Sequence, residues 1–154
     1  MTKEQKHLLI KDICARLPYG VILEIGYGTE NGVEYKNEVM GSTLLCDIMT
    51  SEYSHVKPYL RPLSSMTEEE KKEILTLLVG KDAIGYFQVE NNGITNTDEN
   101  IQLGPNWTYH WLNFSNKNIS LYVYWLNAHH FDYRGLIEKG LALEAPKGMY
   151  KTES

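Results

Sequence analysis

The sequence predicts an α+β protein in which helices pack on a small antiparallel, partly curled sheet. Some segments repeat apolar side chains at helical spacing, and others alternate apolar with polar residues or are rich in β-branched and aromatic ones. The chain has 154 residues, of which 42% are hydrophobic and 23% are charged, as in ordinary globular domains. This length can bury a core without a disulfide or a metal. We therefore predict a single domain spanning residues 1–154.

The N-terminal third predicts one helix followed by a meander. The helix covers residues 3–16, begins at a Thr2 cap and ends at the Pro18-Tyr19-Gly20 sequence. Its apolar stripe contains Leu9, Ile10, Ile13, Cys14 and Leu17. Residues 21–40 alternate in a way typical of strands, residues 43–49 are largely apolar, and glycines mark the turns between these segments. They predict three antiparallel strands, at 21–27, 33–40 and 43–49.

The remainder predicts two more helices and two more strands. A helix at 67–79 is indicated by a capping box, in which Thr67 and Glu70 satisfy each other's backbone amides. Strands are expected near 83–90 and 107–114. The 55–63 segment contains two prolines, which confine it to extended or irregular backbone. Residues 118–128 suit a strand by their β-branched and aromatic content and a helix by their length and an asparagine cap, and we favour the helix.

Charge and cysteine content restrict the environment and the partners. The formal net charge is −5, whereas proteins that hold nucleic acid in general carry a basic excess. We therefore expect no general nucleic-acid binding. The sequence contains no apolar run typical of a signal peptide or a membrane span, so we expect a cytoplasmic protein without membrane contact. Cys14 and Cys46 are predicted to be small buried side chains rather than a disulfide.

Catalytic patterns are sparse. His129 and His130 are adjacent, so on a helix they point about 100° apart, unlike metal-binding histidines. Glu24 with Glu34 and Lys36 resembles the two acidic groups and lysine of a metal-dependent nuclease, but it also fits the solvated side of a hairpin. No nucleophile with a nearby base and no phosphate-binding glycine motif is present. We assign no catalytic residue, no metal and no cofactor.

Aromatic and cationic residues indicate ligand binding instead. The rings of Trp107, Tyr109 and Trp111 can stack on a nucleobase, although core packing is the alternative for each ring. A guanidinium can bind phosphate through two hydrogen bonds, or else form a surface ion pair. For Arg134 the expected pair is Asp132 or Glu138. The predicted ligand-binding residues are Arg134, Tyr133, His129, His130, Arg61, Tyr59, Trp107, Tyr109 and Trp111.

Three stretches carry a family resemblance. LLIKDICARLPYGV (8–21), HVKPYLRPLSSMTEEEKKE (55–73) and WLNAHHFDYRGLIEKGLALEAPKGMY (125–150) together cover about half the chain. They resemble a family of small uncharacterised proteins of phages and prophage-like elements of gut bacteria. The resemblance implies an accessory gene of a mobile element that acts on the host or its defences. It implies no catalytic residues.

These observations lead to one hypothesis and two alternatives. We expect a non-enzymatic phage accessory protein, for host takeover or against host defence, that sequesters a small nucleotide-like ligand in the host bacterial cytoplasm. The ligand class best suited is a nucleotide immune signal. An inhibitor or adaptor that binds a host protein through the lysine- and arginine-free 82–116 region is the alternative. A metal-dependent nuclease that uses Glu24, Glu34 and Lys36 is the more distant alternative. We also expect a homo-oligomer, because small ligand-capturing proteins often build pockets between subunits.

Overall fold

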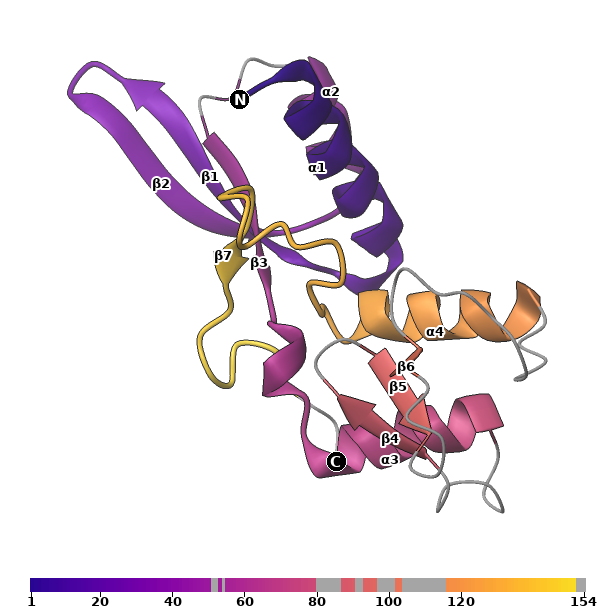
Figure 1. Ribbon diagram of the computed structural model, residues 1–154. Coiled ribbons are helices and arrows are strands. Elements are labelled where there is room, and N and C mark those ends of the chain that lie inside the picture. The colour runs from indigo at the N-terminus through magenta and orange to yellow at the C-terminus, as the bar shows by residue number, and fades with distance from the viewer. Residues whose placement is uncertain are drawn as a thin grey trace. The chain divides into compact units, whose positions relative to one another are not determined.

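The computed structural model describes residues 1–50, 53, 55–79, 87–90, 93–96, 102–103 and 116–151 (Figure 1). The chain divides into two compact units. Unit 1 consists of residues 1–61 and 127–154, and unit 2 consists of residues 62–126. The α+β class is confirmed by the described residues, which form four helices and a four-stranded sheet that does not close. Folding of the whole chain as one domain stays a prediction.

Unit 1 contains an open, mixed sheet with two helices on one face (Figure 1). The strand order is β2-β1-β3-β7, with β2 and β3 antiparallel to β1 and β7 parallel to β3. Because of β7, the prediction of a purely antiparallel sheet was wrong. The elements are α1 (Lys3–Arg16), η1 (Leu17–Tyr19), β1 (Ile22–Thr29), β2 (Gly32–Val39), α2 (Ser42–Thr50), β3 (His55–Leu60) and β7 (Leu143–Glu144).

The core of unit 1 lies between the two helices and the sheet. It is formed by Leu9 and Ile13 of α1, Leu44 and Ile48 of α2, Leu23 and Ile25 of β1, and Val21, Met40, Leu60, Leu136, Leu141 and Ala142. Burial of such side chains removes apolar surface from water, which contributes about 25 cal/mol per Å². The sheet face that carries Leu23, Ile25 and Leu60 is therefore covered by α1 and α2. These two helices do not cover the opposite face.

Helix α1 forms where the sequence predicts it, but its buried face differs. Thr2 caps it, and Gln5 completes a capping box with hydrogen bonds of 2.8 and 3.2 Å. Its buried residues are Leu9, Asp12, Ile13 and Arg16. Cys14 is exposed, so the prediction of a buried thiol was wrong. The apolar pattern misled because two charged residues occupy the buried face and neutralise each other there.

The prediction of a strand at 43–49 was also wrong, because these residues form helix α2. Leu44 and Ile48 are four residues apart and both are buried, which is helical rather than strand spacing. Cys46 lies on the outer side of this helix and is exposed. The predicted three-stranded meander is therefore the hairpin β1–β2, and its missing strand neighbour comes from further along the chain.

The missing strand is β3, in the segment that contains prolines. Pro58 faces Leu23 of β1 across the ladder. On the other side of β3, β7 pairs only with Tyr59 and Leu60, so within the described part of the chain Pro58 has no strand neighbour there. A residue without an N–H is tolerated at such an edge position.

Unit 2 consists of two helices and a small sheet. Helix α3 begins at the predicted capping box, in which Thr67 N donates to Glu70 Oε2 (2.9 Å) and Glu70 N donates to Thr67 Oγ1 (3.2 Å). Trp125 Nε1 on α4 donates to Glu73 Oε1 on α3 at 3.0 Å. The elements are η2 (Leu63–Ser65), α3 (Glu68–Val79), β4 (Phe87–Glu90), β5 (Gly93–Asn96), β6 (Gln102–Leu103) and α4 (Asn116–Ala128), with antiparallel strand order β4-β5-β6.

Unit 2 therefore confirms the helices predicted at 67–79 and 118–128. The strand predicted near 83–90 is present as β4 over Phe87–Glu90, the part that the structure describes. The segment 107–114, and with it Trp107, Tyr109 and Trp111, lies outside the described residues.

Candidate functional site

The uncovered face of the sheet in unit 1 collects polar and aromatic side chains from three strands. On β3 the side chains alternate, so Pro58 and Leu60 are buried under the helices while His55, Lys57 and Tyr59 are half-buried on the other side. The register of β1 aligns Glu24 with Lys57 and with Asn37 of β2. It also aligns Gly26 with His55 and with Tyr35. We call the side chains of Glu24, Tyr35, Asn37, His55, Lys57 and Tyr59 the outer face.

Glu24 is the centre of the outer face. Its Oε1 lies 2.8 Å from His55 Nε2, and its Oε2 accepts a hydrogen bond from the Tyr59 hydroxyl at 3.1 Å. The side chains of His55 and Glu24 are 21% and 24% exposed, so the contacts are partly shielded from water. Burial, and next the hydrogen bond to Glu24, raise the pKa of Tyr59, which keeps its hydroxyl a donor. One carboxylate thus fixes the orientation of two rings.

Gly26 makes room for an aromatic pair above the central strand. The rings of Tyr35 and His55 meet edge to face, with centroids 5.0 Å apart and planes at 87°. A Cβ at Gly26 would lie 2.9 Å from His55 Cβ and 3.1 Å from Tyr35 Cε1. Glycine at this strand position therefore permits the two rings to approach. Sequence reasoning missed Glu24, His55 and Gly26 as a group, although glycine inside a strand is a known sign of close approach.

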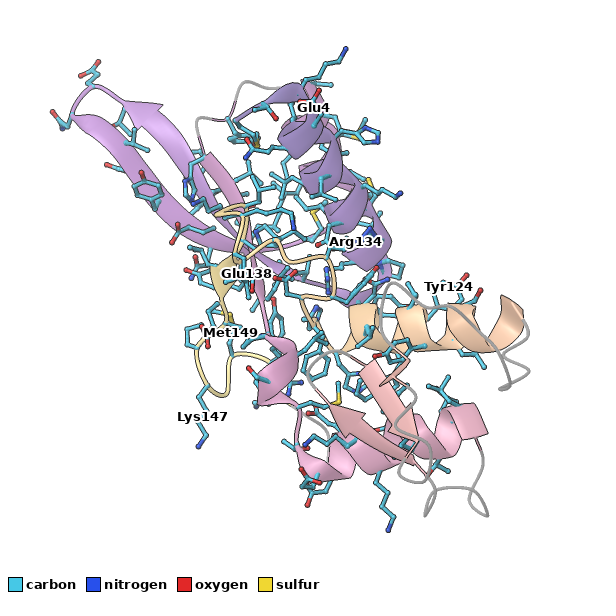
Figure 2. All side chains as sticks on the ribbon, viewed as in Figure 1. Glu4, Tyr124, Arg134, Glu138, Lys147 and Met149 are labelled. Carbon is cyan, nitrogen blue, oxygen red and sulfur yellow. The ribbon has the colours of Figure 1, made fainter. Side chains whose placement is uncertain are left out.

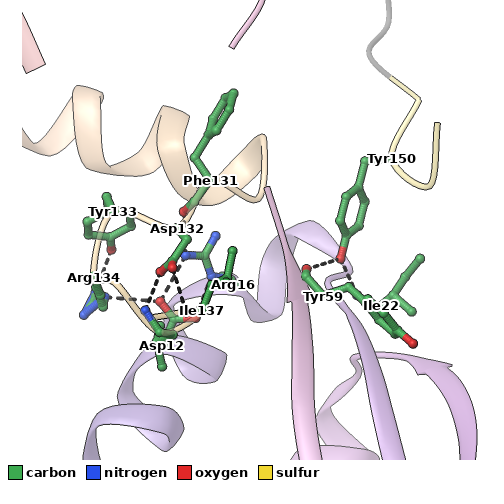
Figure 3. A network of polar contacts seen from close by, with 11 residues as sticks. Asp12, Arg16, Ile22, Tyr59, Phe131, Asp132, Tyr133, Arg134, Ile137 and Tyr150 are labelled. Atoms are coloured by element: carbon green, nitrogen blue, oxygen red, sulfur yellow. Dashed lines mark hydrogen bonds and ion pairs between the residues drawn. The ribbon is translucent and has the colours of Figure 1, made fainter. Parts of the chain in front are cut away.

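The predicted residues Tyr133 and Arg134 belong to a second, more buried cluster of unit 1 (Figure 3). Arg16 donates to both carboxylate oxygens of Asp12, at 2.7 and 3.0 Å, and to the Phe131 carbonyl at 2.8 Å. Both charged side chains are fully buried. Arg134 Nε lies 3.2 Å from Asp12 Oδ1, an ion pair without hydrogen-bond geometry, and its Nη2 donates to the Tyr133 hydroxyl at 2.6 Å. We call Asp12, Arg16, Tyr133 and Arg134 the arginine cluster.

Arg134 is therefore held by Asp12, and neither of the two partners expected from the sequence takes that place. The Asp132 carboxylate instead accepts hydrogen bonds from the backbone amides of Leu136 and Ile137, both at 2.8 Å, and pins the turn (Figure 3). Glu138 lies on the surface in the same loop (Figure 2). The side chain of Arg134 is only 18% exposed, so the cluster braces α1 against this loop.

Arg61 and His130 lie beside the arginine cluster. The Arg61 guanidinium stands 4.2 Å from the centroid of the Phe131 ring, and its backbone N–H donates to the His130 carbonyl at 2.8 Å. The His130 ring stacks on Tyr150 at 3.8 Å. Burial, and next the charge of Arg16, lower the pKa of His130 to about 4, so the ring is neutral near pH 7. His129 is half-buried next to it.

The structure thus divides the predicted ligand residues. Arg61, His130, Tyr133 and Arg134 come together near the Phe131 segment, whereas Tyr59 belongs to the outer face. The nuclease arrangement does not form, because Glu34 and Lys36 pair with Tyr27 and Ile25 and so lie on the sheet face opposite to Glu24. Lys36 pairs with Glu38 instead and lies 4.6 Å from the centroid of the Tyr27 ring. Within the described ranges, no three histidine, cysteine or acidic residues are grouped as metal ligands.

Comparisons with known proteins add no relative. No family model, no curated protein and no solved structure matches the chain. Of the helices that the structure describes, none has the length and apolar character needed to cross a bilayer.

Proposed function

We propose that the protein binds a small nucleotide-like ligand on the outer face and sequesters it without chemical conversion. The observation that carries the proposal is the alternation of β3, which puts His55, Lys57 and Tyr59 on the uncovered side of the sheet beside Tyr35. An exposed sheet face with aromatic rings and cations suits a ligand that combines a flat base with phosphate.

The rings supply the surface for the base. Tyr35 is 58% exposed, and its ring is held against His55 before any ligand arrives. Stacking of a base on an aromatic side chain contributes about 1–3 kcal/mol. Because Glu24 already fixes His55 and Tyr59, little side-chain entropy remains to be lost on binding.

Lys57 supplies charge for the phosphate. It lies on the outer face opposite Glu24 in the ladder. Within the part of the chain that the structure describes, Lys57 forms no ion pair with a carboxylate. The next outward side chain along β3 is Tyr59, so Lys57 lies between the His55 and Tyr59 positions of the strand. A lysine beside three rings favours an anionic aromatic ligand over a neutral one.

The biological role that we propose follows from the family resemblance. A phage accessory protein with such a face would lower the concentration of a nucleotide immune signal in the host bacterial cytoplasm. Binding of a host protein through residues 82–116 is the alternative, and most of that region, including Trp107 and Trp111, lies outside the described residues. A stoichiometric protein captured from host lysate, and lost with Trp107→Ala and Trp111→Ala, would favour the alternative.

Titration calorimetry tests the ligand proposal. The panel contains cyclic dinucleotides, cyclic trinucleotides and ADP-ribose derivatives, together with the matching nucleosides and inorganic phosphate. We expect heat from at least one nucleotide and none from phosphate alone. Absence of heat and of thermal stabilisation across the panel would refute the proposal.

Two variants with matched controls locate the site. Tyr35→Ala should weaken binding by about 1–3 kcal/mol, or roughly 5- to 150-fold in Kd. Lys57→Ala should weaken it most at low salt and reduce its salt dependence. The controls are Tyr124→Ala, at a tyrosine that is 59% exposed on α4, and Lys147→Ala, at an exposed lysine that points away from the sheet (Figure 2). Equal losses in variants and controls would show that the ligand binds elsewhere.

A further inference from the structure

Strand β2 is an edge with an apolar row along it. It pairs with β1 on one side, and among the described residues no strand pairs with its other side (Figure 1). Val33, Tyr35 and Val39 on this strand are 46%, 58% and 65% exposed. An exposed edge strand of this length, with apolar side chains, is a template for pairing with another strand.

The ladder shows which backbone groups point outward. Met40 N donates to Val21 O at 2.8 Å, which makes this a hydrogen-bonded pair next to the end of the β1–β2 ladder. Hydrogen-bonded and non-hydrogen-bonded pairs alternate along an antiparallel ladder. Glu34, Lys36 and Glu38 therefore bond to β1. The outward N–H and C=O groups belong to Val33, Tyr35, Asn37 and Val39.

The side chains of β2 are complementary to a second copy of the same strand. Suppose that two copies run antiparallel with Asn37 opposite Asn37. Lys36 of each copy then faces Glu38 of the other, and Tyr35 faces Val39. Opposite charges and an aromatic residue facing a β-branched one both stabilise cross-strand pairs, by about 0.2–1 kcal/mol each.

A slip of two residues removes this complementarity. It puts Lys36 opposite Lys36 and Glu34 opposite Glu38, and like charges facing each other are destabilising. A slip of four residues restores opposite charges, with Tyr35 facing Tyr35 and Glu34 facing Lys36. It leaves Val39 without an apolar partner, so the register centred on Asn37 covers the two most exposed apolar residues of β2 together.

We propose that two copies of this protein form a dimer by antiparallel pairing of β2 with β2, centred on Asn37. The two sheets then become one continuous sheet, and the two outer faces lie on the same side of it. The six hydrogen bonds of the junction come from the outward groups of Tyr35, Asn37 and Val39 in each copy. The inference stands on the edge alone and does not need a ligand.

Sedimentation of the wild type and of Asn37→Pro tests the pairing. The N–H of Asn37 points away from β1, so proline removes junction bonds while the bonds within the hairpin remain. We expect a concentration-dependent dimer for the wild type and a monomer for the variant, with the same far-ultraviolet circular dichroism. A wild type that stays monomeric over the whole concentration series would overturn the proposal. So would a dimer that survives the proline.

A charge swap tests the facing residues and does not depend on how well the proline variant folds. Lys36→Glu and Glu38→Lys should each dissociate the dimer, because each puts like charges opposite one another. The double variant Lys36→Glu/Glu38→Lys should dimerise again. With the four-residue slip, the double variant would instead leave two carboxylates facing each other and stay monomeric, which would contradict the register.

A cysteine substitution locates the two-fold axis. Hydrogen-bonded antiparallel pairs have Cα atoms about 5.5 Å apart, within disulfide range. In a Cys14→Ser/Cys46→Ser background, Asn37→Cys should give an oxidised dimer on a non-reducing gel. Tyr35→Cys in the same background is the matched control. It should run as a monomer on that gel, because in this register residue 35 faces residue 39 and not another cysteine. The reverse result would overturn the register centred on Asn37.

Discussion

Replacement of Asp12 with alanine should destabilise unit 1 more than any surface change. Asp12 and Arg16 are both fully buried, four residues apart on α1. Removing one partner of such a pair leaves an uncompensated charge in the interior, which costs about 3–5 kcal/mol. After the substitution the Arg16 side chain keeps its hydrogen bond to the Phe131 carbonyl at 2.8 Å. Its Nη1 already has no hydrogen-bond partner within the described residues, so the upper half of that range is expected.

The loss of folding free energy expected for Asp12→Ala is large compared with the stability of a small protein. A native domain is stable by about 5–15 kcal/mol, so the variant loses a large part of that margin. For a chain of this size each kcal/mol lowers Tm by about 2–4 °C, so a loss of about 4–5 kcal/mol gives a decrease of about 8–20 °C. The matched control is Glu68→Ala. It removes an ion pair with Lys71 in which Glu68 is 84% exposed, and such pairs contribute about 0–1 kcal/mol.

Two probes of unfolding follow the effect in each unit. All three tryptophans lie between residues 107 and 125, inside unit 2, so tryptophan fluorescence reports that unit. Circular dichroism reports helices of both units. If the chain unfolds as one domain, Asp12→Ala shifts both transitions equally. If the units unfold separately, it shifts only the part of the dichroism change that comes from unit 1 and leaves the fluorescence transition in place. A loss no larger than that of the control would refute the argument about the buried pair.

The double variant Asp12→Leu/Arg16→Met refines the same argument. It removes both charges and keeps apolar volume, so it should be more stable than Asp12→Ala alone. Arg134, at 18% side-chain exposure, can then turn toward water. A double variant as unstable as the single one would show that the pair is not the cause.

Two further predictions concern a glycine and a histidine. Gly26→Ala should cost about 1–3 kcal/mol in urea unfolding, because the new Cβ would lie 2.9 Å from His55 Cβ, whereas Gly28→Ala, with nothing within 4 Å, is the control. His130 has a pKa lowered to about 4 by burial, against about 6.5 when unfolded, so its contribution to stability falls as pH drops from about 6.5 to 4, by at most about 1.4 kcal/mol per unit. His130→Asn tolerates the left-handed backbone (φ 59°) and should flatten that slope, and an unchanged slope would contradict the assignment.

Local chemistry in the sequence determined the starts of helices α1 and α3 and the hairpin. A capping box involves residues three apart, so Thr67 and Glu70 could be recognised without knowing the fold. The alternation of Val21 to Met40 around a glycine turn likewise depends only on neighbouring residues. For these elements the local preference and the final structure agree.

For short apolar or proline-containing segments, the local sequence did not decide the secondary structure. Residues 43–49 contain enough apolar residues to line a strand or one face of a helix, and only packing against β1 and α1 selects the helix. The two prolines of 55–63 left extended and irregular backbone both open, and only the sheet shows that Pro58 occupies an edge position on β3 that tolerates it. In both cases the deciding interactions come from other parts of the chain.

The candidate site depended on tertiary structure even more. The sequence supplied its chemical types, including the aromatic and cationic residues of β3. It could not bring Glu24 to His55, 31 residues away, nor show that Arg134 is neutralised by Asp12 from the first helix. Pairing register decides which side chains share a sheet face, and a shift by one residue would exchange the two faces. That register is set by burial of Leu23, Ile25 and Leu60 under the helices, a property of the whole unit and not of any segment of the sequence.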